Sequence, residues 1–390
     1  MDGFSPLADL VARSRKPDRE LFFWQELRVA FEARERKAVR VAARLREAVS
    51  VRDEKALAAM DGCSREQVAA LLSVKPKSVP AFSWDGELQV PEPSALATQL
   101  PSLPLTVGVT TSRVVVVRGD GVFAATRPVV VDATNNAGET FSWVWGQPVP
   151  PMAEATAGKA APPSGRFRAL LRPQPAAVLC HELFGHPLEA DVFFSGQSPW
   201  AGKLGTRVTA APLTVVDDPQ AQLPGGFSAD DEGEPGRPKA LLNGGVLAGV
   251  LADRSYGALA VKAGNARRAS PHHPPLPRLS NLLSWVEGGD PTPPLGEATV
   301  EIVRVRSGAV LPGENAAVLA VSESYTLSRG RRKAHLAPFF LRLPLAADGI
   351  VGGGGNPEPV AEPGWCHKGR QLLPVGAAAS WLLLAGVEVA

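Results

Sequence analysis

Two histidines and a glutamate lie close together in the segment 180–189. His181 and His186 are five residues apart, and Glu182 directly follows the first histidine. A catalytic zinc ion needs three protein ligands and one open position for water, and a nearby carboxylate can accept the proton of that water. The segment therefore predicts a zinc site on His181 and His186 with Glu182 as the general base. The alternative interpretation is a surface His-Glu pair beside an unrelated histidine.

The spacing of these two histidines departs from that of a regular metal-binding helix. Histidines four residues apart share a helix face, whereas histidines five apart diverge by about 140°. Gly185 stands directly before His186 and Pro187 directly after it. A π-type turn at this point would return both imidazoles to one face. We therefore expect the helix to depart from regular α geometry between Glu182 and Pro187.

The local motif does not identify the third metal ligand. The candidates are Cys366, His367 and the pair His272 and His273, with His335 as a weaker one. A lone cysteine is more often a core residue than a ligand. Cys366 nevertheless has a loop-like neighbourhood rich in proline and glycine, and a thiolate with two imidazoles would complete a three-ligand zinc site.

The length of 390 residues suggests two domains. A stretch rich in proline, glycine and alanine at 148–165 predicts the boundary, with an N-terminal domain at 1–163 and a C-terminal domain at 164–390. The expected fold class is α+β: a small domain of mixed α and β structure, followed by a predominantly antiparallel β domain with an embedded metal-binding helix.

Individual elements can also be predicted from local patterns. Period-two hydrophobicity over 20–36 indicates a strand, and Ser64 is a typical N-cap. The proline- and serine-rich segment 75–104 is expected to be a connector. A strand is expected over 168–171, with Pro175 opening the metal-binding helix, and a buried strand is expected over 376–387.

Composition bounds the classes of function. The formal net charge of +2, from 41 basic and 39 acidic residues, argues against a dedicated nucleic-acid or membrane-surface binder. Three cysteines form no disulfide framework, which favours a reducing cytoplasm. The N-terminus opens no apolar signal segment, and the apolar stretch 376–387 is shorter than the ~20 residues that a membrane helix needs.

On several motifs the sequence resembles the TldD/TldE (PmbA) metallopeptidases, also called modulators of DNA gyrase. Active members carry H-E-x-x-G-H, which residues 181–186 match, and an L-E-x-D continuation, which residues 188–191 match. Further similar blocks lie at 215–218, 230–233, 264–268, 277–281 and 366–375. The resemblance covers about 164–390, with only a loose match before it and a chain shorter than typical members. His367 and Arg370 replace two glycines of the family pattern.

The resemblance implies zinc on His181, His186 and Cys366, with Glu182 as the catalytic base. Family members form dimers that enclose the active site and act on short or unfolded peptides, so we expect a cytoplasmic zinc peptidase working as a homodimer or with a related subunit. Retention of Glu182 favours the active type. One alternative is a catalytically silent or regulatory subunit of a TldD/TldE-like heterodimer. Another is a protein-binding regulator.

Three further residues are candidates for substrate binding. Arg267 and Arg268 could grip a substrate carboxylate with forked hydrogen bonds, and Tyr325 could steady a tetrahedral oxyanion as a phenol donor. The alternatives are surface salt bridges for the two arginines and an exposed strand hydroxyl for Tyr325.

Overall fold

The computed structural model describes residues 2–13, 19–35, 37–53, 56–84, 87–100, 104–136, 138–150, 156–259, 261–345, 349–361 and 364–390. The fold is α+β, with two large sheets that are mostly antiparallel. The last strand of the first sheet, β7, ends at Val144, and the first strand of the second, β8, begins at Phe167. The proposed domain boundary between residues 163 and 164 falls in this interval. No helix among the described residues is long and apolar enough to cross a membrane.

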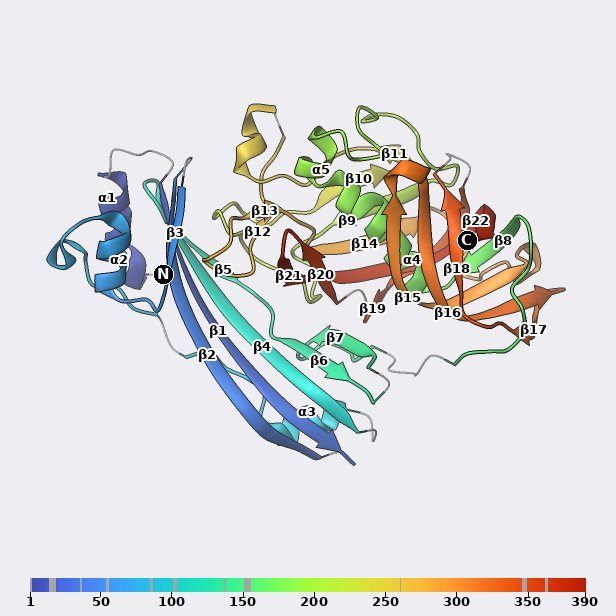
Figure 1. The fold of residues 1–390 in the computed structure, drawn as a ribbon, viewed down its shortest axis with the longest axis horizontal. Helices are drawn as coiled ribbons and strands as arrows, with labels where there is room; N and C mark the ends of the chain where they lie inside the picture. Colours follow the sequence, from blue (N-terminus) through green and yellow to red (C-terminus); the bar gives the residue numbers. More distant parts are fainter. Residues whose placement is uncertain are drawn as a thin grey trace.

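The N-terminal sheet has the strand order β3-β2-β1-β4-β6-β7, with β5 paired to β4. Helices α1 and α2 pack near one end of its long strands, and α3 lies near the other end (Figure 1). The elements are η1 (Asp2–Phe4), α1 (Pro6–Ala12), β1 (Glu20–Arg34), β2 (Lys37–Asp53), β3 (Ala56–Asp61), α2 (Arg65–Leu72), η2 (Pro76–Ser78), α3 (Pro93–Gln99), β4 (Leu105–Arg118), β5 (Gly121–Thr126), β6 (Val130–Thr134) and β7 (Thr140–Val144).

Local sequence explains most of these elements. The strand expected over 20–36 is β1, and the Ser64 cap is confirmed: its side chain accepts a hydrogen bond from the Gln67 amide, and the Gln67 side chain bonds the Ser64 amide in return. The connector expected over 75–104 is wrong in part, because it contains α3. This helix begins at Pro93 and has only seven residues, too few turns to produce a periodic pattern.

The C-terminal domain is built on an eleven-stranded sheet with the order β11-β10-β9-β14-β22-β18-β16-β15-β8. Strand β8 pairs with both β15 and β22, so the path β22-β8-β15-β16-β18 closes into a barrel. The strands are β8 (Phe167–Leu171), β9 (Leu213–Asp217), β10 (Lys239–Asn243), β11 (Val246–Leu247), β12 (Ala266–Arg267), β13 (Leu276–Pro277), β14 (Asn281–Val286), β15 (Val300–Leu311), β16 (Ala316–Ser328), β17 (Arg331–His335), β18 (Phe339–Pro344), β19 (Ile350–Val360), β20 (Trp365–Lys368), β21 (Gln371–Pro374) and β22 (Gly376–Val389).

The expected embedded helix is α4, which contacts β22, β15, β14 and β19 and packs in the main hydrophobic core. In Figure 1 it lies among the strands of the C-terminal domain. The helical elements of this domain are α4 (Pro173–Cys180), η3 (His181–Gly185), η4 (His186–Leu188), α5 (Ala190–Phe194), η5 (Arg254–Leu259), η6 (Leu295–Glu297) and η7 (Pro312–Glu314).

A buried carboxylate of β15 ties the end of β8 to β17, the strand paired with β16. Glu301 of β15 is fully buried, and it accepts hydrogen bonds from Arg172 at 2.6 Å and Arg332 at 2.7 Å. Arg172 directly follows β8 and Arg332 belongs to β17. Burial raises the pKa of the Glu301 carboxyl, but the hydrogen bonds from the two arginines outweigh it and hold the pKa below its usual value.

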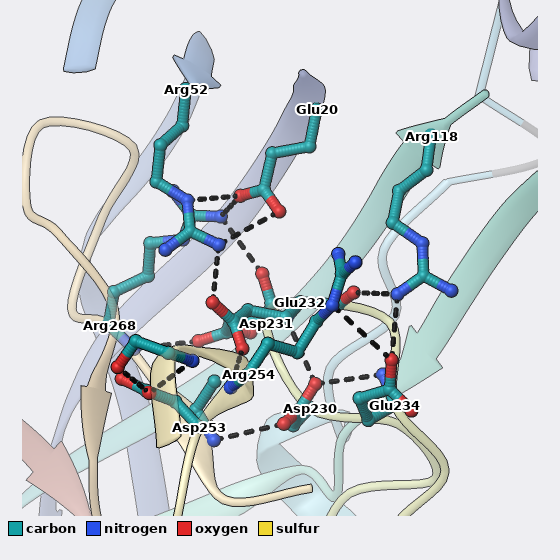
Figure 2. Close-up of polar contacts among 12 residues, drawn as sticks. Glu20, Arg52, Arg118, Asp230, Asp231, Glu232, Glu234, Asp253, Arg254 and Arg268 are labelled. Carbon is teal, nitrogen blue, oxygen red and sulfur yellow. Dashed lines mark hydrogen bonds and ion pairs between the residues drawn. The ribbon is translucent and has the colours of Figure 1, made fainter. Parts of the chain in front are cut away.

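A network of charged side chains lies between the N-terminal sheet and the C-terminal domain (Figure 2). Arg268 donates to Glu20 of β1 at 2.8 Å and to the main-chain oxygen of Asp231 at 2.9 Å. Arg52 of β2 donates to Glu20 at 3.0 Å and pairs with Glu232. The carboxylates of Glu20 and Glu232 are each 1% exposed. Removing one partner of a buried ion pair strongly destabilises a protein. This network therefore fixes the two domains against each other.

Candidate metal centre

The helix that leads to the site is fixed by its first turn and by its burial. Helix α4 begins at Pro173, two residues before the expected Pro175, and Pro173 tolerates this position because the first N–H of a helix has no partner. The Gln174 side chain both donates to and accepts from the main chain of Val305 at 3.0 Å. Residues 175–180 are all buried, and the end of the helix packs in the main hydrophobic core.

The expected departure from α geometry is confirmed. Residues His181–Gly185 form a single π-helical turn, and a short 3-10 turn begins at His186. A Cβ at Gly185 would lie 2.6 Å from Leu279 Cδ1, so any larger residue would force the Leu279 side chain to move. The indole of Trp200 donates to the main-chain oxygen of Leu183 at 2.5 Å. Glycine and this indole together stabilise the widened turn.

The π turn brings the two imidazoles together, and the distant Cys366 meets them. The Nε2 atoms of His181 and His186 are 3.2 Å apart, and Cys366 Sγ lies 3.1 Å from His186 Nε2. All three potential ligand atoms lie within 4.8 Å of one another. Two ligand nitrogens of a tetrahedral zinc ion are separated by about 3.3 Å. This set of two imidazoles and one thiol therefore fits zinc in both chemistry and spacing.

Cys366 is placed by a tight hairpin. Strands β20 and β21 are joined by Gly369 and Arg370, which have φ values of +55° and +63°. Two positive φ angles are typical of the two-residue turns that connect hairpin strands. Arg370 therefore adopts the left-handed conformation at a position where the family pattern has glycine. Arg278, which is buried, donates to the main-chain oxygen of Cys366 at 2.8 Å and anchors the hairpin.

Glu189 orients His186 from behind. Its fully buried carboxylate lies 3.1 Å from His186 Nδ1 and accepts a hydrogen bond from Lys368 Nζ at 2.7 Å. Burial raises the pKa of Glu189, but His186, Lys368 and Arg278 outweigh it and lower the pKa to about 2. A carboxylate bonded to the second nitrogen of an imidazole fixes which nitrogen faces the metal and makes it a stronger ligand.

The electrostatics of the site favour a bound cation. Burial raises the pKa of Cys366, yet hydrogen bonds to His181 and His186 lower it to about 5. Burial lowers the pKa of His186, but Glu189 and the Cys366 sulfur raise it to about 11. A proton on His186 thus supplies the positive charge that the thiolate and carboxylate require. A metal ion would supply the same charge and would leave both imidazoles free to act as ligands.

Glu182 shares a cavity with the three potential ligands. The cavity has a volume of about 730 Å³, and Gly138, Glu139 and Thr140 of the N-terminal domain form part of its wall. Burial raises the pKa of the Glu182 carboxyl, with a partial offset from His181 and His186. The side chain is accommodated by Gly308 of β15, where a Cβ would lie 2.8 Å from Glu182 Cγ.

The other histidine candidates lie outside the His181, His186 and Cys366 cluster. His367 lines the cavity without joining the cluster. His272 lies 2.9 Å from Asp61, and His273 lies 2.9 Å from Ser270. His335 stacks on Tyr325 and bonds the main-chain oxygen of Thr156.

The three candidates for substrate binding do not line this cavity. The Tyr325 hydroxyl donates to Glu323 at 3.1 Å, so its role as an oxyanion donor stays a prediction. Arg267 and Arg268 are each 2% exposed, and they line a separate small pocket between the domains. Surface salt bridges are therefore the wrong interpretation for both arginines.

Glu189, Lys368 and Gly308 were not predicted as parts of the site. Glu189 stands in the L-E-x-D block after the zinc motif, and Lys368 stands in the cysteine block. The available signal was a carboxylate three residues after a predicted histidine ligand. Gly308 gave no local signal, because its contact with Glu182 depends on the placement of β15 against α4.

Several known proteins are similar to this chain in sequence or in fold. A family model described as the PmbA/TldA metallopeptidase C-terminal domain matches residues 164–314. A metalloprotease from Methanothermobacter thermautotrophicus is 30% identical over 229 residues, which are 55% of this chain and 48% of that protein. A zinc metalloprotease TldD homolog from Saccharolobus solfataricus is 31% identical over 134 residues, which are 33% of this chain and 29% of that protein.

The structural likeness extends over the whole chain. The crystal structure of TldE from Thermococcus kodakarensis superposes with a TM-score of 0.69 at 13% identity and covers 99% of this chain and 100% of that one. At this identity the likeness concerns the fold alone. Residues 164–314 are thus similar in sequence to the PmbA/TldA metallopeptidase C-terminal domain, and the whole chain shares the fold of TldE. It spans about half the length of the curated relatives that it matches.

Proposed function

We propose that this protein is a zinc-dependent peptidase that hydrolyses short or unfolded peptides. The observation that carries the proposal is the cluster of His181, His186 and Cys366 beside Glu182 in one cavity. Support comes from relatives named metalloproteases, one of them a zinc metalloprotease. A donor set of two imidazoles and one thiolate leaves one position of a tetrahedral site open, as catalytic zinc sites do.

Each group has a definite task in this proposal. A zinc ion held by the three side chains would supply Lewis-acid chemistry, lowering the pKa of water and polarising a carbonyl group. Glu182 accepts the proton of the attacking water and delivers it to the leaving amine. Its raised pKa suits a group that must both accept and release a proton. Glu189 holds His186 in the required orientation through Nδ1.

The size of the cavity supports a peptide rather than a folded substrate. A volume of about 730 Å³ lies in the range of cavities that enclose small ligands, so a few residues of an extended chain can enter. Arg304 and Arg306 of β15 and residues 138–140 of the N-terminal domain border this space. Both domains would therefore contact the substrate.

The alternative is a catalytically silent or regulatory subunit of a heterodimer; the fold is shared with a protein named TldE. Glu182 argues against it, because a purely structural zinc ion needs no base. The same proposal includes assembly as a homodimer or with a related subunit. It also includes a cytoplasmic location, in keeping with the free cysteines Cys63, Cys180 and Cys366. Light scattering of the purified protein, alone and mixed with a candidate partner, tests the assembly.

The experiment that tests the proposed activity combines metal analysis with peptide hydrolysis. Purified protein should contain close to one zinc ion per chain and cleave an unstructured fluorogenic peptide, and a chelator should abolish the cleavage. His186→Ala should lose both the metal and the activity. Cleavage that persists in the metal-free protein would refute the proposal, and a zinc-loaded protein that never cleaves, alone or with a partner, would favour the silent subunit.

A further inference from the structure

A small enclosed pocket lies between the two domains, next to the candidate metal centre. One wall is the face of the N-terminal sheet that carries Trp24, Glu26 and Arg28 of β1. Three arginines, Arg127, Arg267 and Arg268, also line it, and we call it the arginine pocket. Trp365, the residue before Cys366, lines both this pocket and the cavity of the metal centre. The two spaces therefore share one indole wall.

The charges around the arginine pocket do not balance. Arg28 pairs with Glu26 at 2.7 Å, Arg127 pairs with Asp231, and Arg268 pairs with Glu20 at 2.8 Å. Among the described residues, no carboxylate pairs with the remaining arginine, Arg267.

Arg267 is bonded only to main-chain oxygens. Its Nη1 donates to Leu279 at 2.5 Å and its Nη2 donates to Pro374 at 2.8 Å. Burial, Arg127 and Arg278 lower the pKa of Arg267 to about 9, although Asp231 and Asp217 act in the opposite direction. A buried charge without a directly paired carboxylate is costly, so an anion in the pocket would compensate for it.

Several buried nitrogens of the pocket also lack acceptors. Within the described part of the chain, Nε of Arg127, Nε of Arg267, and both Nε and Nη1 of Arg268 have no hydrogen-bond partner. Unpaired buried donors are rare in folded proteins. A ligand that accepts hydrogen bonds from these nitrogens must carry acceptor atoms and a negative charge. Guanidinium groups match carboxylate oxygens particularly well, through paired hydrogen bonds.

We propose that the arginine pocket binds the C-terminal carboxylate of the peptide whose chain occupies the neighbouring cavity. Its volume of about 40 Å³ is room for about three waters, the size of a carboxylate group. Because Trp365 lines both spaces, the pocket adjoins the cavity in which the peptide would lie. The assignment rests on the proposed peptidase function and adds a preference for peptides with a free C-terminus near the cleaved bond.

The test measures binding rather than cleavage. Zinc-loaded Glu182→Gln protein is titrated by calorimetry with N-acetylated peptides of two to six residues, each made with a free C-terminal carboxylate and as the carboxamide. At the length that spans the two spaces, the free acid should bind about tenfold more tightly, because hydrogen bonds to charged groups are among the stronger ones. Adding Arg267→Met should erase this difference. Arg331→Met, at an exposed position on β17, should leave the difference unchanged.

Each unfavourable outcome points to a different error. Equal affinities for acid and amide at every length would overturn the assignment, even if Arg267→Met does not fold. A preference that survives Arg267→Met would place the carboxylate elsewhere, for example on the metal. Acetate that raises the unfolding temperature through Arg267, without any acid preference in the peptides, would make the occupant a free anion. Cleavage by the wild type without an acid preference would leave the peptidase standing and refute only the arginine pocket.

Discussion

Replacing Gly308 by alanine should displace Glu182, the proposed base, without disturbing the proposed metal ligands. A methyl group at this position would lie 2.8 Å from Glu182 Cγ, 3.0 Å from Leu319 Cδ2 and 3.1 Å from Val178 Cγ1. Because carbon atoms pack at about 3.5–4.0 Å, the Glu182 side chain must move by roughly 0.7 Å or more. A displacement of about 1 Å in a reacting group can cost about 100-fold in rate. We therefore expect kcat to fall about 10- to 100-fold.

The assay follows hydrolysis of a fluorogenic unstructured peptide, with the zinc content measured on the same sample. Zinc should stay near one ion per chain, and overpacking should cost about 1–3 kcal/mol of unfolding free energy. Gly296→Ala is the matched control, since its added methyl group meets no atom within 4 Å. A Gly308→Ala protein that cleaves at the wild-type rate would refute the placement of Glu182 as base. Loss of zinc would show that the strain reaches the ligands instead.

Two further predictions concern buried carboxylates. Glu189→Gln should weaken zinc binding about 10- to 100-fold in chelator competition, the usual cost of losing the group that orients a ligand imidazole. Asp191→Asn, which changes the other carboxylate bonded to Lys368, should change affinity far less, and equal losses would contradict the role of Glu189. Glu301→Gln should lower the unfolding free energy by about 1.5–3 kcal/mol near neutral pH. The folded-state pKa of Glu301 is lowered from its ordinary value of 4.5. The stability difference between wild type and Glu301→Gln should therefore shrink as the pH falls below 4.5, as measured by denaturant unfolding at several pH values. A difference that does not change with pH would show that the lowered pKa does not contribute to stability.

The sequence predicted the local part of the site better than its surroundings. The five-residue spacing of His181 and His186, with Gly185 between them, required a widened turn, and the π turn is present. Cys366 remained one of several candidates until the resemblance favoured it, because no local pattern joins it to residues 180 positions earlier. The structure brings its sulfur to 3.1 Å from His186.

Contacts between distant segments were not predictable in this way. Gly308 meets Glu182, and Lys368 meets Glu189, only because the barrel closes and the β20–β21 hairpin folds back on it. Composition likewise gave no sign that Arg267 and Arg268 are buried. That burial follows from the docking of the N-terminal sheet over them, which neither charge nor periodicity reveals.

The proposed peptidase function depends most directly on separate roles for the metal ligands and for Glu182. The decisive measurement is peptide hydrolysis by Glu182→Gln protein whose zinc content has been determined. Glutamine keeps the shape of the side chain but cannot accept a proton from water at neutral pH. If Glu182 is the base, the Glu182→Gln protein should keep full zinc occupancy and cleave the peptide at least about 100-fold more slowly than the wild type. A zinc-loaded Glu182→Gln protein that cleaves at close to the wild-type rate would contradict it.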